Sequence, residues 1–192
     1  MQLLTLQKSD LQLNTFLEKA NEAYKARSNE SVPFTPITAQ DIKNNEQIFV
    51  VMDGEEMVSG CCIDPFQKNA VRLQHVWSDV NKTRKGYASF LVDEVEKCVK
   101  QQGWQQLKLG VMSAYMPAYK LYKKKGWKAY AVVANEPKTY YTISMVKYLA
   151  EKGKIRFEIK RSFGYLFSKI KFFLLFKTDS TPTWLYKLIY KK

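Results

Sequence analysis

Residues 73–89 read LQHVWSDVNKTRKGYAS, a segment that passes from a strand through a polar, basic loop into a helix. The strand is predicted over 71–78 from its β-branched and aromatic residues. Gly86 opens the helix and Gly103 ends it. The segment matches neither the phosphate-loop pattern G-x-x-x-x-G-K-[ST] nor the dinucleotide pattern G-x-G-x-x-G. It therefore has to be interpreted from its physical chemistry.

The start of this helix is suited to bind an anion. A helix N-terminus exposes unpaired amides and the positive end of the helix dipole. Gly86 and Ala88 let the backbone approach a phosphate closely, and Arg84 and Lys85 add positive charge. An ordinary strand-to-helix turn with a solvated basic loop explains the same residues equally well. On this stretch alone, both interpretations stay open.

The flanking segments predict a domain that mixes helices and strands. Hydrophobic periodicity and turn residues give the order strand, helix, helix, three strands, helix, strand, helix, two strands. Ser9 with Gln12, and Thr38 with Asp41, have the spacing of helix capping pairs. Besides the segments above, helices are predicted over 10–26, from Thr38 and over 117–126, and strands over 47–52, 57–63, 107–112, 127–133 and 140–146. This pattern is typical of an α/β domain of the α+β type.

Composition limits the class of protein. The 192 residues suit one domain, and 46% hydrophobic residues exclude a wholly disordered chain. The 31 basic and 18 acidic residues give a net charge of +13. Three cysteines without a C-x-x-C motif make a disulfide framework and a metal site improbable. With no apolar run long enough for a signal peptide or a bilayer span, a cytoplasmic protein is expected.

A second motif lies one strand later. Residues 118–127 read AYKLYKKKGW, and Ala118, Leu121 and Tyr122 fall on one face of the predicted helix. Together with TRKGYA at 83–88, this segment resembles the GNAT superfamily of acetyl-CoA-dependent N-acetyltransferases. In that family a strand leads into [QR]-x-x-G-x-[GA], and a later helix carries A-x-x-[LF]-Y-x-x-x-G-[FW]. Thr83 stands where the family has Gln or Arg, and the second motif is complete.

The resemblance implies a fold and an activity. The fold is a mixed, mostly antiparallel, splayed central sheet flanked by helices, within a domain over 1–150. The activity is transfer of an acetyl group from acetyl-CoA to a primary amine of a small molecule or peptide by direct attack. Val76, Trp77 and Ser78 would bind the pantetheine arm through main-chain groups. The pyrophosphate would lie on the amides of Arg84, Lys85, Gly86, Tyr87, Ala88 and Ser89, and Tyr122 would act as general acid near the thioester sulfur.

Some titratable residues have a structural interpretation as well. Taken alone, Tyr122 suits a half-buried core tyrosine, and the motif around it favours the catalytic role. His75 has an ordinary pKa near ~6.5 that suits proton relay, but a packed strand histidine is the favoured interpretation. Glu46 and Glu55 are expected to be solvated. Cys61 and Cys62 are expected to be small core residues, as are many free cysteines.

Residues 151–192 form a basic C-terminal extension with 11 basic and 3 acidic residues, a net of +8. Apolar residues recur there at helical spacing, which predicts a basic amphipathic helix: Phe163, Leu166, Phe167, Ile170, Phe173 and Leu174. The extension could pack on the domain or across a homodimer, bind a membrane surface, or contact nucleic acid, which ranks last. The alternative to an enzyme is a non-catalytic module that binds CoA, or binds membrane or nucleic acid through this extension.

Overall fold

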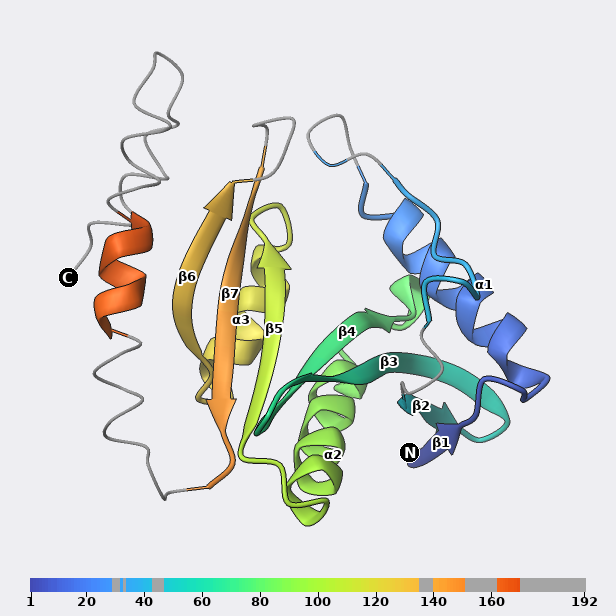
Figure 1. Cartoon of the computed structure of the whole chain (residues 1–192). Coiled ribbons are helices and arrows are strands. Elements are labelled where there is room, and N and C mark those ends of the chain that lie inside the picture. The colour runs from blue at the N-terminus through green and yellow to red at the C-terminus, as the bar shows by residue number, and fades with distance from the viewer. Residues whose placement is uncertain (29–31, 33, 43–46, 135–139, 151–161, 170–192) are drawn as a thin grey trace.

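The computed structural model describes residues 1–28, 32, 34–42, 47–134, 140–150 and 162–169. Their strands form one sheet in the order β1-β2-β3-β4-β5-β7-β6, with helices on both faces (Figure 1). The elements are β1 (Gln2–Leu6), α1 (Gln12–Lys25), β2 (Gln47–Asp53), β3 (Glu56–Gln67), β4 (Ala70–Ser78), the 3-10 turn η1 (Val80–Lys82), α2 (Tyr87–Gln101), β5 (Gln106–Met112), α3 (Met116–Lys124), β6 (Lys128–Ala134) and β7 (Tyr141–Tyr148).

The sheet is splayed at its centre. Neighbouring strands are antiparallel except β4 and β5, which run parallel. These two strands pair only over residues 70–72 and 106–108. Beyond that short pairing the two halves of the sheet diverge, as Figure 1 shows. The predicted mixed, mostly antiparallel, splayed sheet is confirmed.

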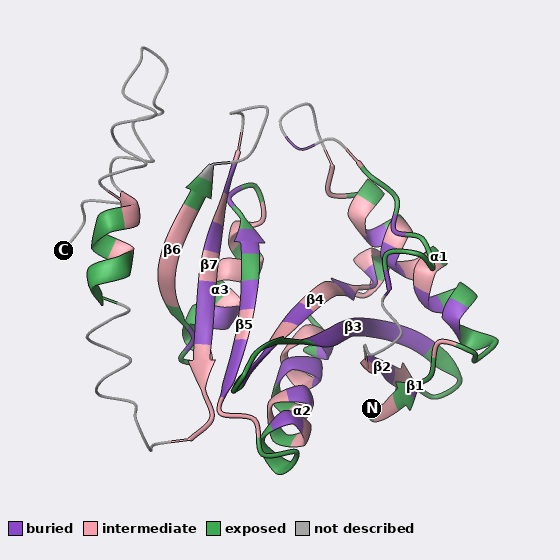
Figure 2. Cartoon of the chain, viewed as in Figure 1, coloured by how far each residue is buried: buried purple, intermediate pink, exposed green. Residues whose placement is uncertain are grey.

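The two faces of the sheet carry separate cores. On one face, α1 contributes Phe16 and Ala20 to a cluster that includes Trp77 of β4. On the other face, α2 and α3 contribute Leu91 and Tyr122 to a larger cluster with β3, β4 and β5. Figure 2 shows the buried residues concentrated along the strands and on the inward sides of α1 and α2. The periodicity of the helices therefore predicted their buried sides correctly.

Two predicted helix starts are wrong. The N-cap of α1 is Leu11, which caps nothing, and Asp10 instead accepts a 2.7 Å hydrogen bond from the Gln7 amide. Residues 38–42 form a turn rather than a helix. There the Thr38 amide and hydroxyl each donate 2.8 Å bonds to Asp41. Capping residues stabilise isolated turns as well as helices, so the pattern alone could not separate the two.

Residues 162–169 of the extension are helical, and the other predicted helical positions lie outside the described residues. This helix contacts the outermost strand, β6, where the Val132 amide donates a 3.2 Å bond to the Ser168 hydroxyl. Its Phe163, Leu166 and Phe167 side chains are exposed. The helix is therefore amphipathic, with only one side turned toward the sheet.

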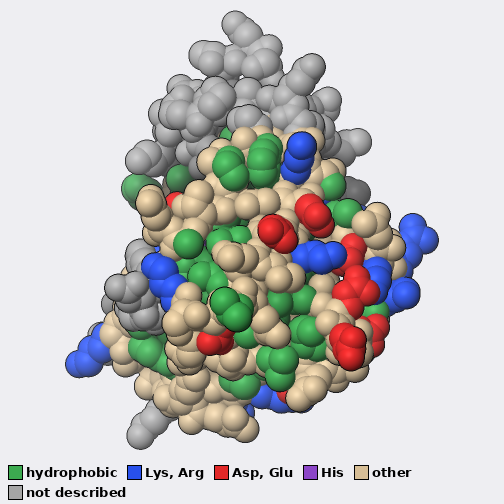
Figure 3. Space-filling model, turned by 90° about the vertical axis from the view of Figure 1, so that its right-hand side faces the viewer, with side chains coloured by type: hydrophobic (Ala, Val, Ile, Leu, Met, Phe, Trp, Pro, Cys, Tyr) green, Lys and Arg blue, Asp and Glu red, His purple; other side chains and the backbone are tan. Residues whose placement is uncertain are grey.

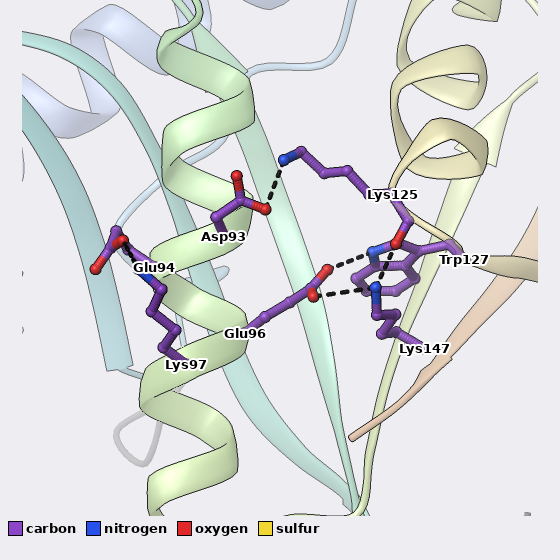
Figure 4. Close-up of polar contacts among 7 residues, drawn as sticks. All are labelled: Asp93, Glu94, Glu96, Lys97, Lys125, Trp127 and Lys147. Carbon is purple, nitrogen blue, oxygen red and sulfur yellow. Dashed lines mark hydrogen bonds and ion pairs between the residues drawn. The ribbon is translucent and has the colours of Figure 1, made fainter. Parts of the chain in front are cut away.

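Polar contacts join α2 to the end of α3 (Figure 4). The Glu96 carboxylate accepts a 2.7 Å bond from the Trp127 indole and lies 3.3 Å from the Lys147 ammonium. The Lys125 ammonium lies 2.6 Å from Asp93, and Lys147 donates to the Lys125 carbonyl. These contacts fix the distance between the helix that carries the first motif and the helix that carries the second.

We expect Glu96→Ala to lower the free energy of unfolding by about 1–3 kcal/mol, because it leaves the Trp127 indole without its acceptor and removes the carboxylate partner of Lys147 in a partly buried site. Glu94→Ala is the matched control. Among the described residues Glu94 bonds to Lys97 one turn away, and such an exposed pair contributes little to stability. Urea unfolding monitored by circular dichroism measures both variants. Equal effects would contradict this account of Glu96.

Candidate active site

The divergence of β4 and β5 opens a cavity of about 410 Å³. Its described walls are residues 72–76 of β4, residues 109–112 of β5, and Tyr24, Val32, Phe34, Thr35, Ile37, Tyr115, Ala118, Tyr122 and Tyr140. Ile37 belongs to the core cluster on the α1 side of the sheet, and Tyr122 of α3 belongs to the cluster on the opposite side. The cavity therefore connects the two faces through the gap in the sheet.

Tyr122 lies at the α3 wall of this cavity. The side chain is 4% exposed, and its ring packs against Trp127 with 5.4 Å between centroids. No group in the described part of the chain forms a hydrogen bond with its hydroxyl. Burial raises the pKa of Tyr122 well above its ordinary value, as does nearby Cys61, whereas Arg27 lowers it. The phenol is therefore protonated at neutral pH, and the Tyr122 side chain lines the cavity.

The first motif forms a turn with exposed amides. Arg84 has φ 64° and Gly86 has φ 86°, so two left-handed residues flank Lys85 immediately before α2. No side chain caps the helix, and its first ladder bond runs from the Phe90 amide to the Gly86 carbonyl. Successive amides in such a turn form a concave surface that binds anions. This geometry favours the phosphate-binding interpretation over a plain turn.

Tyr87 anchors this turn to the β2–β3 hairpin. It is 5% exposed, and its hydroxyl donates to the Asp53 carboxylate. That bond lowers the pKa of Asp53 and raises the pKa of Tyr87. The Tyr87 side chain is thus a structural group, and its backbone amide is the part that faces the turn. Ala88 and Ser89 continue the first turn of α2, where amides have no intrahelical acceptor.

The end of β4 already has partners from α1. The Val76 carbonyl accepts a 3.4 Å bond from the Tyr24 hydroxyl, and the Ser78 carbonyl accepts a 3.0 Å bond from Arg27. Each carbonyl keeps a second lone pair for another donor. Trp77 is buried, and its carbonyl accepts a 2.6 Å bond from the Ser59 hydroxyl on the β3 side. The Trp77 carbonyl is thus engaged on the β3 side, whereas the carbonyls of Val76 and Ser78 are engaged by Tyr24 of α1 and by Arg27 just after α1.

His75 lines the same cavity in an unusual backbone conformation. Its φ is 50°, at a bulge where three steps of β4 oppose two steps of β3. Within the described residues its ring forms no hydrogen bond. Burial and nearby Arg72 lower its pKa below 6.5, while Asp41 and Asp64 oppose that shift. The imidazole is consequently neutral at pH 7, with a lone pair available.

The other described residues that were selected from the sequence do not line the cavity. Cys61 and Cys62 are buried, and burial raises the pKa of the Cys61 thiol, so their prediction as core residues is confirmed. Glu55 is exposed, and Glu46 lies outside the described residues. Among the described residues, no three or more His, Cys, Asp or Glu side chains gather as a metal site would require.

Three residues at the site were missed from the sequence. Tyr24 entered the prediction only as part of the helix over 10–26, and Arg27 lies just beyond that helix, yet both bond to β4 across about fifty positions of sequence. Arg72 was counted only as part of a strand, yet it lines the cavity. Spacing along one segment carries no signal for contacts between distant segments. The one feature of the sequence that indicated a role at the site was the charged or hydroxyl side chain at each of these positions.

A model of the Acetyltransferase (GNAT) family matches residues 13–127, more than half of the chain. The chain belongs to this family. The match spans both motifs and the strands that bound the cavity, so this acetyltransferase has its family's characteristic segments in the expected order. No curated protein matches the sequence.

Solved structures share the fold of this acetyltransferase at low sequence identity. An N-acetyltransferase from Staphylococcus aureus has a TM-score of 0.63 and 17% identity, with 78% of this chain and 100% of that one covered. A ribosomal-protein-alanine N-acetyltransferase from Brucella melitensis has a TM-score of 0.63 and 13% identity, with 77% and 99% covered. An aminoglycoside 6'-N-acetyltransferase complexed with coenzyme A has a TM-score of 0.62 and 15% identity, with 78% and 98% covered.

The lowered pKa of His75 makes the stability of the acetyltransferase depend on pH. Between that pKa and about 6.5 the unfolded chain binds more protons at this histidine than the folded chain. The histidine therefore makes the free energy of unfolding rise with pH in this window, and its contribution is lost as the pH falls. We expect His75→Gln to flatten this dependence, as measured by urea unfolding at about pH 5.5 and about pH 7.5.

Because the chain has one histidine, its imidazole proton resonance is unambiguous in an NMR titration. The midpoint should lie below about 6.5. A midpoint at or above that value would show that the ring is solvated rather than buried in the cavity wall.

Proposed function

We propose that this protein transfers the acetyl group of acetyl-CoA to a primary amine by direct attack. The observation that carries the proposal is that Tyr122, whose hydroxyl no described residue bonds, lines the cavity between β4 and β5. The uncapped, left-handed turn before α2 supports it, since a diphosphate suits such a site. Membership in the acetyltransferase family gives the reaction type, and the geometry suggests which residues perform it.

In this proposal the first motif holds the diphosphate. The amides of residues 84–89 donate to the phosphate oxygens, and the Arg84 and Lys85 side chains contribute charge. The pantetheine arm follows the free side of β4, where the carbonyls of Val76 and Ser78 keep a lone pair each. Trp77 serves by packing, because its carbonyl bonds to Ser59 instead. The thioester thereby reaches the cavity at Tyr122.

The chemical step requires one proton donor and one proton acceptor. The amine nitrogen attacks the thioester carbonyl carbon, a C–N bond forms, and the C–S bond breaks. Tyr122 donates a hydrogen bond to the departing sulfur and then its proton. Its raised pKa keeps the hydroxyl protonated at neutral pH, so that a proton is present to be donated. His75, neutral and without a hydrogen bond to the described residues, is placed to take the proton that the amine loses, directly or through water.

We expect Tyr122→Phe to lower kcat by about 10²–10⁴-fold, because the departing thiolate loses its donor. CoA affinity should stay unchanged, since the phenol contributes no diphosphate contact. Thiol release from acetyl-CoA measures turnover, and isothermal titration measures CoA binding. Tyr119→Phe is the matched control, because Tyr119 lies on the same helix but does not line the cavity. A protein that binds neither acetyl-CoA nor CoA would refute the proposed function.

We further propose that residues 151–192 form an extension separate from the catalytic domain over 1–150, which suits β7 ending at Tyr148. The proposed compartment is the cytoplasm, supported by three free cysteines. In the described part of the chain no helix has the length and hydropathy to cross a bilayer. Homodimer formation stays a prediction, and nucleic acid is not an expected partner.

The extension helix suits the surface of an anionic membrane. Phe163, Leu166 and Phe167 are 70%, 56% and 77% exposed on one short helix, within a segment of net charge +8. By contrast, acidic and basic side chains are intermixed on the face of the domain in Figure 3. Exposed apolar residues beside lysine and arginine bind anionic lipid through both burial and charge.

We expect the full-length protein to co-sediment with vesicles of phosphatidylcholine and phosphatidylglycerol. The triple variant Phe163→Ser, Leu166→Ser, Phe167→Ser should lose most of this binding. Val133→Ser, which removes an exposed apolar residue from β6 instead, should retain it. Pelleting that is equal for the three proteins would contradict a role for this helix at membranes.

A further inference from the structure

The charges around the cavity restrict the chemistry of the acceptor. Among the described residues that line it, Arg72 carries the one permanent charge, and no aspartate or glutamate is present. Arg27, which donates to the Ser78 carbonyl, adds a second positive charge, and it partly offsets the rise that burial causes in the pKa of Tyr24, Tyr115 and Tyr122. The described walls are therefore positive and aromatic.

Arg72 is held rigidly by its neighbours on β3. Its Nε and Nη2 donate bonds of 3.2 and 3.0 Å to the two oxygens of Asp64, and its Cζ lies 5.2 Å above the Phe66 ring. Asp64 is 2% exposed and also accepts a 2.9 Å bond from Gln74. The carboxylate is thus enclosed and cannot serve a ligand. Its role is to orient the guanidinium.

Arg72 keeps donors for a ligand after this pairing. A guanidinium has five N–H groups, and the pair with Asp64 uses two of them. The Arg72 side chain is 35% exposed, so the N–H groups that Asp64 does not bind are accessible to a ligand. A guanidinium whose orientation is fixed by a carboxylate and an aromatic ring is preorganised to bind a second carboxylate or a phosphate through its free N–H groups.

The same walls disfavour a polycationic acceptor. An ammonium that enters this cavity loses water and finds no aspartate or glutamate among the described lining residues, because Asp64 lies behind the wall and is already bonded to Arg72 and Gln74, while Arg27 repels it. Positive surroundings lower the pKa of a bound ammonium. They therefore favour the neutral amine, which is the form that attacks a thioester.

We propose that the acceptor is an amine that also carries a carboxylate or phosphate, which binds the free N–H groups of Arg72 while the amine points toward Tyr122. The inference rests on the proposed acetyl transfer and names the substrate class of that site. The anion binds the N–H groups that Asp64 leaves free, and the aromatic walls accommodate the carbon skeleton. Arg72 is then a specificity-determining residue, positioned by Asp64.

The test compares matched amines with the wild-type protein and acetyl-CoA, with thiol release as the readout. α-, β- and γ-amino acids are each set beside the amine of equal chain length without the carboxylate. Phosphoethanolamine is set beside ethanolamine, which separates phosphate from carboxylate as the preferred anion. An aminoglycoside is included as a polycation. We expect kcat/KM for at least one amine with an anionic group to exceed that of its matched amine without that group by about tenfold or more.

Two variants then assign the preference to Arg72. Arg72→Gln alone leaves Asp64 buried and unpaired and can destabilise the fold, so the double variant Arg72→Gln, Asp64→Asn removes both charges together. We expect it to bind acetyl-CoA with unchanged affinity, while the ratio of kcat/KM within each pair falls toward one, mainly through KM. Lys97→Gln on α2 is the control for loss of a positive charge and should leave the ratio unchanged.

The outcomes separate the two proposals. A wild-type enzyme that prefers the amines without an anionic group, or the aminoglycoside, overturns the inference. A double variant with the same ratio of kcat/KM within each pair as the wild type does so too. Binding of acetyl-CoA without turnover of any amine in the panel also counts against it. Failure to bind acetyl-CoA overturns the proposed function itself.

Discussion

Three residue pairs hold the two halves of the sheet together at its centre. Residues 70–72 of β4 pair in parallel with residues 106–108 of β5, and every other strand pairing is antiparallel and longer. Parallel strands require a long crossover, which α2 supplies. Because the pairing stops early, main-chain groups of β4 are left without a strand partner inside the protein. The short pairing of β4 with β5 explains the cavity, the position of Tyr122 and the access of α1 to β4.

The predictable part of the site is local in sequence. The turn at residues 84–86 depends on glycine conformation, and the cavity-facing side of α3 depends on helical spacing. Both features are determined by residues within one short segment. The fold class followed from the order of such segments. The failures at Leu11 and Thr38 concern helix starts, where the same polar residues also stabilise turns.

The unpredicted part of the site depends on contacts between segments. Arg27 reaches Ser78 from α1, and Arg72 is fixed by Asp64 and Phe66 of the neighbouring strand. Strand register decides such contacts, and the bulge at His75 changes which residues face the cavity. A one-residue shift in β4 would move Arg72 and Gln74 to the opposite face. Strand register thus decides which charged side chains line the cavity where the acceptor would bind. The alternation of residues along one strand does not specify that register.

The contact between Ser168 and the Val132 amide has a consequence for how copies of the chain meet. β6 ends the sheet, so its outward backbone groups form a template on which a foreign strand could assemble. The Ser168 hydroxyl occupies one of those donors, and the helix over residues 162–169 lies along the same edge. Among the described residues, this helix thereby covers part of the edge at which intermolecular β-augmentation could start. Without it, the Val132 amide would lose its hydrogen-bond acceptor and be open to a foreign strand.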